Sequence, residues 1–160
     1  MTSTNHSSLP RHLTKAAIHQ EDASELSFGL EFENSTCLTL SEAKVILEEV
    51  LKTRRKDQGR SADGDDMEGL TLLSSVTKKT KDYLDQFARF KTSETVAACE
   101  NIIRNPQHEL HSFEQAQLGS LCPEESDEAK TLIPSLGAKV TDESLDALLD
   151  NLTSLRRFQV

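Results

Sequence analysis

The spacing of apolar residues constrains the fold of this 160-residue chain more than any other feature. The clearest stripe lies near the C-terminus, where five leucines recur three or four positions apart, as one face of an α-helix requires: Leu145, Leu148, Leu149, Leu152 and Leu155. Similar spacing predicts helices over about residues 39–56, 67–90, 92–104, 112–121 and 124–133. We therefore predict an all-α fold, a bundle of about six helices joined by short connections.

Start signals for several of these helices support the prediction. Thr39 with Glu42, and Ser112 with Gln115, match the capping box, in which the first and fourth side chains each bind the other residue's backbone N–H. Thr141 is the expected N-cap of the last helix. The helices are thus expected to begin at defined residues.

One segment breaks the helical pattern. Over residues 25–33 the apolar residues Leu26, Phe28, Leu30 and Phe32 occupy every second position, which predicts an extended segment with one apolar face. A lone strand is not stable, because its backbone groups and its apolar face need a partner. The segment either lies across the chain's own helices or adds a strand to another protein's sheet. We favour the second interpretation, because the sequence offers no other strand.

Two regions carry no apolar period. Residues 1–19 are rich in Ser, Thr and His and predict a disordered tail, and residues 57–66 (DQGRSADGDD) predict a mobile loop. The expected organisation is therefore the tail, a partner-binding arm and first helix over residues 20–56, the loop, and a helical domain over residues 67–160.

Composition excludes several classes of protein. The 18 Lys and Arg against 27 Asp and Glu give a net charge of −9, which disfavours direct nucleic-acid binding. No apolar run approaches the ~20 residues that a membrane span needs. The three cysteines, Cys37, Cys99 and Cys122, fit no closed disulfide set and indicate a reduced, intracellular chain.

No pattern in the sequence predicts chemistry. His108 and His111, with Cys122 downstream, form the nearest approach to a metal site, but no second Cys or acid stands at ligand spacing. We interpret both histidines as exposed loop residues. The acidic run at residues 124–128 is interpreted as a solvated helix start, where carboxylates favour the positive end of the helix dipole. We expect no catalytic, cofactor or metal site.

Aromatic residues close to lysines could indicate stacking on RNA bases. Lys78, Lys79 and Lys81 lie near Tyr83 and Phe87. Both aromatics share the apolar stripe of their predicted helix, so we assign them to the core.

Several blocks of sequence occur in an order and spacing that match a known family. They cover residues 22–33, 40–43, 79–91, 113–121, 128–136 and 145–152. The most specific are Phe-Ala-Arg-Phe at residues 87–90 and Leu-Ile-Pro-Ser-Leu at residues 132–136. Through these blocks, which are distributed over residues 21–158, the chain resembles the fourth-largest subunit of eukaryotic DNA-directed RNA polymerase II.

This resemblance implies a helical fold similar to the HRDC domains of helicases, and a non-catalytic subunit without a cofactor. It implies an obligate heterodimer with the seventh subunit of RNA polymerase II, an OB-barrel protein, that joins the core polymerase as a stalk near the RNA exit channel. The implied roles are transcription initiation, handling of the emerging transcript and recruitment of processing factors. The implied place is the nucleus, and also the cytoplasm through mRNA export and decay.

The resemblance also gives the alternating segment a partner. The predicted contacts with the seventh subunit are the four alternating side chains, two residues of the first helical stripe and one residue off the main stripes: Leu26, Phe28, Leu30, Phe32, Ile46, Val50 and Phe90. Two alternatives stay open, namely the equivalent stalk subunit of RNA polymerase III and a free-standing HRDC-like nucleic-acid-binding module. The second would need a basic face.

Overall fold

The structure is a computed structural model that describes residues 21–32, 35–57 and 75–158. Within these ranges the chain forms six α-helices, two 3-10 helices and no strand, which confirms the all-α prediction. They are α1 (Leu40–Asp57), α3 (Ser75–Phe87), α4 (Ser93–Ile103), η1 (Pro106–His108), α5 (Ser112–Leu121), α6 (Ser126–Leu132), η2 (Pro134–Ala138) and α7 (Asp142–Arg157). The expected tail, residues 58–66 of the expected loop and the first part of the helix predicted over residues 67–90 lie outside the described residues.

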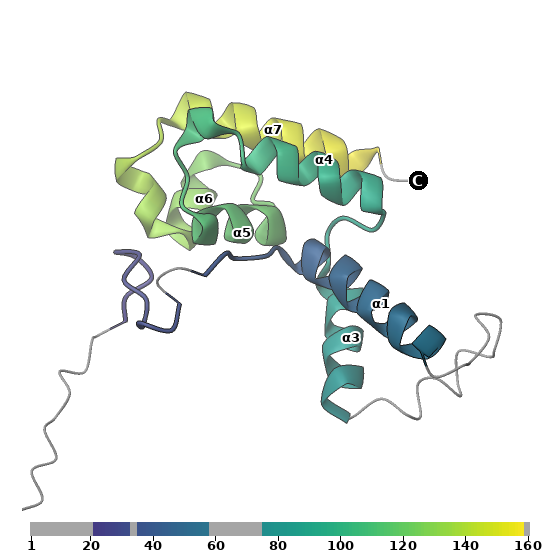
Figure 1. Ribbon diagram of the computed structural model, residues 1–160. Helices are drawn as coiled ribbons and strands as arrows, with labels where there is room; N and C mark the ends of the chain where they lie inside the picture. The colour runs from purple at the N-terminus through teal and green to yellow at the C-terminus, as the bar shows by residue number, and fades with distance from the viewer. Residues whose placement is uncertain (1–20, 33–34, 58–74, 159–160) are drawn as a thin grey trace, which may run out of the picture.

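The helices form two regions, a larger body and a smaller pair of helices. In Figure 1, α4 and α7 lie side by side with α5 and α6 below them, and this group makes up the body of the molecule. Helices α1 and α3 contact each other and extend from one end of the body as a helical pair. The first turn of α1 joins the two regions, because α1 contacts α4 and α5 as well as α3.

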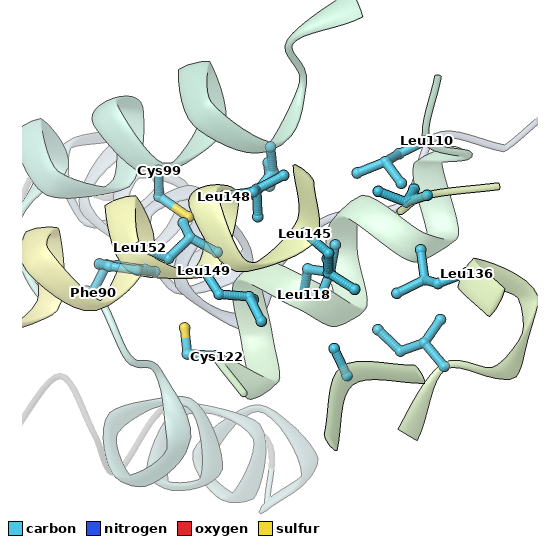
Figure 2. Close-up of a cluster of buried hydrophobic side chains, with 14 of the residues drawn as sticks. Phe90, Cys99, Leu110, Leu118, Cys122, Leu136, Leu145, Leu148, Leu149 and Leu152 are labelled. Carbon is cyan, nitrogen blue, oxygen red and sulfur yellow. The ribbon is translucent and has the colours of Figure 1, made fainter. Parts of the chain in front are cut away.

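The body has a continuous apolar core. The leucine stripe predicted for the last helix lies at its centre, with Leu145, Leu148, Leu149 and Leu152 all buried on α7. Figure 2 shows these leucines beside side chains from other parts of the chain, among them Leu118 and Leu136. Thr141 caps α7 as predicted, since its Oγ1 accepts a hydrogen bond from the Ser144 N–H at 3.4 Å.

Buried polar contacts fix the start of α1 against the body. The predicted capping box is present: Thr39 N–H donates to Glu42 Oε2 at 2.6 Å, and Glu42 N–H donates to Thr39 Oγ1 at 3.1 Å. The other carboxylate oxygen of Glu42 lies 2.7 Å from Arg104 Nη2, at the end of α4. Ser41 Oγ accepts the backbone N–H of Phe90 at 3.0 Å. These contacts set the direction in which the α1–α3 pair leaves the body.

The second predicted capping box lies one residue earlier than expected. His111, rather than Ser112, is the N-cap of α5: its Nδ1 accepts the Phe113 N–H at 3.2 Å, and its own N–H donates to Glu114 Oε2 at 2.7 Å. The shift follows from the burial of Glu114, whose carboxylate also binds Lys139 and therefore turns inward at the third helical position.

The alternating segment is not a strand in the described residues. Asp22 and Ser27 form an isolated antiparallel bridge around a turn, and a second turn follows at residues 30–32. The prediction of an extended segment is wrong for this structure, because no sheet edge is available in the described chain. The backbone N–H groups bond locally instead, as in the reciprocal 2.9 Å hydrogen bonds between Asp22 and Ser27. We refer to residues 21–32 as the arm.

Candidate partner-binding surface

Exposed apolar side chains mark the candidate site. Among the described residues, the large hydrophobic side chains left exposed on the arm, α1 and α3 and on the stretch that leads into α1 are Leu30, Phe32, Leu38, Ile46, Val50, Val76, Tyr83 and Phe87. Elsewhere in the described chain the exposed ones are Leu121, Leu132 and Phe158. We call Leu30 and Phe32 the arm surface. We call Ile46, Val50, Val76, Tyr83 and Phe87 the hairpin surface.

The four alternating residues of the arm do not share one face. Leu30 and Phe32 are 82% and 59% exposed, whereas Leu26 and Phe28 are half-buried. The turns described above rotate successive side chains away from the period of two that an extended strand would impose.

Phe28 fastens the arm to the body. Its ring stacks on the imidazole of His111, with centroids 5.8 Å apart and planes 22° apart. It also meets the ring of Phe113 at 5.0 Å in a tilted arrangement. Both partners stand at the N-terminal end of α5, and we call the site that they form the Phe28 niche. Of the two placements open for the arm, the structure therefore shows Phe28 on the chain's own helices.

The carboxylate of Glu114, the residue after Phe113 on α5, is buried and held by several polar contacts. Glu114 is 0% exposed, and both its oxygens lie 3.0 Å from Lys139 Nζ. Ser135 Oγ donates to Glu114 Oε1 at 2.6 Å, which ties α5 to η2. A buried charge is tolerated only when it is paired and hydrogen-bonded in this way. This network was not predicted from the sequence, where its only signal was an acid in the first turn of a helix.

The stripe predicted on the first helix divides into two parts. Leu51 is buried and Leu47 half-buried, whereas Ile46 and Val50 are 49% and 39% exposed. Ile46 and Val50 lie four positions apart, so they share one face of α1. That face is open in this chain, as a partner-binding stripe must be.

Asp85 of α3 forms one salt bridge to Lys44 of α1 and one to Lys81 within α3. Lys44 Nζ lies 2.8 Å from Asp85 Oδ1, and Lys81 Nζ lies 2.5 Å from Asp85 Oδ2. The hydrogen bonds from Lys44 and Lys81 lower the pKa of the Asp85 carboxyl below its ordinary value. Asp85 is therefore charged at neutral pH, and it links the two helices beside the apolar contact of Leu84.

The aromatic residues of α3 are not in the core. Tyr83 and Phe87 are 51% and 44% exposed, with their ring centroids 4.6 Å apart, and Val76 is 71% exposed. Assigning the two aromatics to the core was wrong, because α3 buries Leu84 and has α1 as its principal neighbour. Hydrophobic periodicity shows which face of a helix avoids water, but not whether the covering surface belongs to the same chain.

Phe90 was predicted to contact the partner, but the structure buries it. It is 1% exposed and lies in the body core beside Leu149 and Leu152 (Figure 2). The prediction rested on its place off the stripe of the helix predicted over residues 67–90. The structure ends α3 at Phe87, and the chain then turns so that Phe90 enters the core from a connection.

The structure places the histidines and cysteines that were weighed as candidate chemical groups. No group of three or more His, Cys, Asp or Glu that could hold a metal ion occurs there. His111 caps a helix and is half-buried, so its interpretation as an exposed loop residue was wrong. Burial raises the pKa of the Cys99 thiol to about 12 and that of Cys122 to about 11, which keeps both neutral.

An acidic hollow lies at the start of α6. It has a volume of about 390 Å³ and is lined by Glu124, Glu125, Ser126, Asp127, Asp146 and Asp150. Asp146 Oδ1 accepts the backbone N–H of Ser126 at 2.9 Å, so this carboxylate caps the helix. The residues thus act at the helix start, as the interpretation of residues 124–128 expected. In the described chain no helix is both long and apolar enough to cross a bilayer.

Comparison with known proteins identifies the relatives of this chain. The family model described as RNA polymerase Rpb4 matches residues 37–156. The chain is 47% identical over 143 residues to DNA-directed RNA polymerase II subunit rpb4 of Schizosaccharomyces pombe, over 89% of this chain and 97% of that protein. It is 33% identical over 143 residues to DNA-directed RNA polymerase II subunit 4 of Arabidopsis thaliana, over 88% and 96% of the two chains.

Proposed function

This chain belongs to the RNA polymerase Rpb4 family, and we propose that, within RNA polymerase II, it pairs with the seventh subunit, an OB-barrel protein, to form a stalk near the RNA exit channel. Relatives from a yeast and a plant are both named as subunits of RNA polymerase II, which favours this polymerase over RNA polymerase III. On this proposal the chain works in the nucleus as a non-catalytic scaffold. It supports initiation, handling of the transcript and recruitment of factors.

The uneven distribution of apolar exposure carries the proposal. The body buries most of its apolar side chains in one core and leaves Leu121, Leu132 and Phe158 exposed, whereas α1 and α3 leave an aliphatic pair and an aromatic pair exposed on the hairpin surface. Soluble monomers rarely expose large contiguous apolar patches, and surfaces of this kind mark protein contacts. Aromatic residues are also enriched among the side chains that dominate the energy of interfaces.

The arm surface and the hairpin surface both supply apolar side chains that a partner could bury. Full burial of a Leu, Ile, Val or Phe side chain contributes about 1.5–3 kcal/mol before the entropy cost of association. Each exposed residue has only part of that gain still available, because part of its surface is already covered. Several such side chains together would contribute favourably to binding.

Aspartate substitutions at exposed positions test the proposal. Ile46→Asp with Val50→Asp, and separately Tyr83→Asp with Phe87→Asp, place charges where a partner would bury apolar groups. We expect each pair to weaken binding to the purified seventh subunit by at least about 100-fold, because a buried unpaired charge costs several kcal/mol. Affinity is measured by isothermal titration calorimetry, and folding by circular dichroism and thermal unfolding.

Leu132 provides a matched control, because it is 49% exposed, as Ile46 is, but lies on α6. Leu132→Asp adds one negative charge at a side chain as exposed as that of Ile46, and combined with Leu121→Asp it adds two, as each test pair does. We expect both control variants to bind as tightly as the unmodified chain. If the α1 and α3 variants bind as tightly as Leu132→Asp, the hairpin surface is not the interface. If the unmodified chain does not bind the seventh subunit at all, the stalk assignment fails.

A further inference from the structure

The arm does not adopt the extended conformation that its alternating apolar residues predict. Alternation over Leu26, Phe28, Leu30 and Phe32 suits an extended strand with one buried face. In the structure the backbone turns twice, and Leu30 and Phe32 point into solvent at 82% and 59% exposure. A local pattern that conflicts with the local structure indicates that a second conformation satisfies it better.

No residue of the arm is fully buried: residues 26–29 are half-buried, and residues 21–25 and 30–32 are exposed. Phe28 makes ring contacts with the body, through the stacked His111 at 5.8 Å and the tilted Phe113 at 5.0 Å. The arm also has internal backbone bonds, among them those of the bridge between Asp22 and Ser27. An element with few buried apolar contacts opens at a lower free energy than the rest of a fold.

The backbone at Leu26 is strained in the docked arm. Its φ of 56° lies in the left-handed region, which costs a branched, non-glycine residue free energy because Cβ crowds the carbonyl oxygen. An extended arm would bring φ of Leu26 back to the β region and remove this cost. Strain of this kind persists only while surrounding contacts maintain it, and here the turn that Asp22 and Ser27 close holds Leu26 in this conformation.

From these observations we propose that the arm is a releasable strap with two states. In the free chain, Phe28 sits in the niche formed by His111 and Phe113, and the arm is folded back. In the assembly, Phe28 leaves the niche and residues 26–32 extend, so that all four alternating side chains face one partner surface. The identity of that partner, the seventh subunit, rests on the proposed function.

The docked state lowers the apparent affinity for the partner. When only a fraction of molecules is competent to bind, the apparent dissociation constant rises in inverse proportion to that fraction. An aromatic contact of the kind that Phe28 makes corresponds to a factor of about 2–10. Weakening the niche without altering the arm therefore strengthens partner binding by about that factor. If the niche instead positions the arm for binding, weakening the niche reduces the affinity for the partner.

Hydrogen exchange on the free chain tests release of the strap. We expect the bridge amides of Asp22 and Ser27 to exchange through a local opening, at rates that do not change when low concentrations of urea destabilise the body. The buried amides around Leu118 and Leu149 should exchange only through global unfolding. If the Asp22 and Ser27 amides exchange together with those of the body, the arm is a fixed part of the fold and the inference is wrong.

Two niche variants of the full chain test the effect on binding. Phe113→Ala removes one ring that Phe28 meets, and His111→Asn removes the stacked imidazole while keeping a side-chain acceptor for the N-cap. We expect both to bind the seventh subunit about 2–10-fold more tightly than the unmodified chain. Phe158→Ala removes a ring that is 83% exposed at the C-terminal end of α7, and it should leave the affinity unchanged. Unchanged or weaker binding by both niche variants overturns the inference.

The two measurements separate this inference from the function on which it rests. If the unmodified chain does not bind the seventh subunit, the proposed function fails, and hydrogen exchange still decides whether the arm is released. If the chain binds but the niche variants gain nothing, the stalk function stands and the strap does not. Tighter binding by both variants, together with local exchange of the arm, supports both.

Discussion

At the scale of single residues, the two buried thiols give the most direct test of the core. The thiolate is the reactive form of cysteine, and burial raises the pKa of Cys99 to about 12 and that of Cys122 to about 11. We expect Ellman's reagent at about pH 8 to modify the half-buried Cys37 in the folded chain and to leave the other two unmodified until the chain unfolds. A Cys37→Ser variant should then show no fast reaction, and equal rates for all three thiols would contradict the described core.

The same shifts predict how stability depends on alkaline pH. The folded-state pKa of each thiol lies above the ordinary value of 9.0, so the unfolded chain loses these protons first as the pH rises. Their contribution to stability is fully present below about pH 9 and declines as the pH approaches about 11–12. Urea unfolding between pH 7 and 10 measures this decline, which should be smaller in a Cys99→Ala variant that is compared with itself across the range.

Gly119 tests the contact between α1 and α5. A Cβ added there would lie 2.7 Å from Thr39 Cγ2 and 3.2 Å from Ile103 Cδ1, so the chain must shift to accept it. Gly→Ala in a helix ordinarily stabilises by about 1 kcal/mol. We expect Gly119→Ala instead to lower the free energy of unfolding by about 1–3 kcal/mol through overpacking. Gly137→Ala is the control, because a Cβ at that position meets nothing within 4 Å, and equal effects of the two would contradict the contact.

At the scale of elements, the helices of the body could be predicted because local and long-range signals agree there. The leucine period of α7, the cap at Thr141 and the capping box of Thr39 and Glu42 are properties of neighbouring residues. The box at α5 was placed one residue late, because Ser112 is the better cap by residue type. The choice of His111 depends on Lys139, which is distant in the sequence and holds Glu114 inward.

The candidate site was predictable only in part, and the misses have two physical causes. Hydrophobic spacing indicates that a face will be buried, but it does not identify the covering surface. Spacing therefore assigned Tyr83 and Phe87 to the core, whereas the structure exposes both. Phe90 was assigned to a partner because it lies off the stripe of a helix predicted to run to residue 90, whereas α3 ends at Phe87 and Phe90 is buried. Ile46 and Val50 are exposed on α1, and their contact with a partner stays a prediction.

At the scale of the whole molecule, the net charge disfavours RNA binding, whereas the exposed aromatic pair would favour it. The chain carries a net charge of −9. Many of its described cations are already paired with acids inside the chain, namely Lys44, Lys52, Lys81, Arg104, Lys130, Lys139 and Arg156. Affinity for nucleic acid depends on cations that neutralise phosphates, so this distribution disfavours RNA. The open ring pair of Tyr83 and Phe87 would favour base stacking if enough cations surrounded it.

We expect the negative charge of the chain to outweigh the attraction of the aromatic pair for RNA bases. Stacking contributes about 1–3 kcal/mol per base, but the phosphates of every bound nucleotide must approach a surface of the same sign. We therefore expect the chain alone to bind a single-stranded RNA of about 20 nucleotides more weakly than about 100 µM at about 150 mM salt, as measured by fluorescence anisotropy. Tyr83→Ala with Phe87→Ala should leave that weak binding unchanged and reduce affinity for the seventh subunit. Micromolar RNA binding that disappears in the double variant would instead make α3 a base-stacking platform, and would favour the free-standing nucleic-acid-binding module over the scaffold.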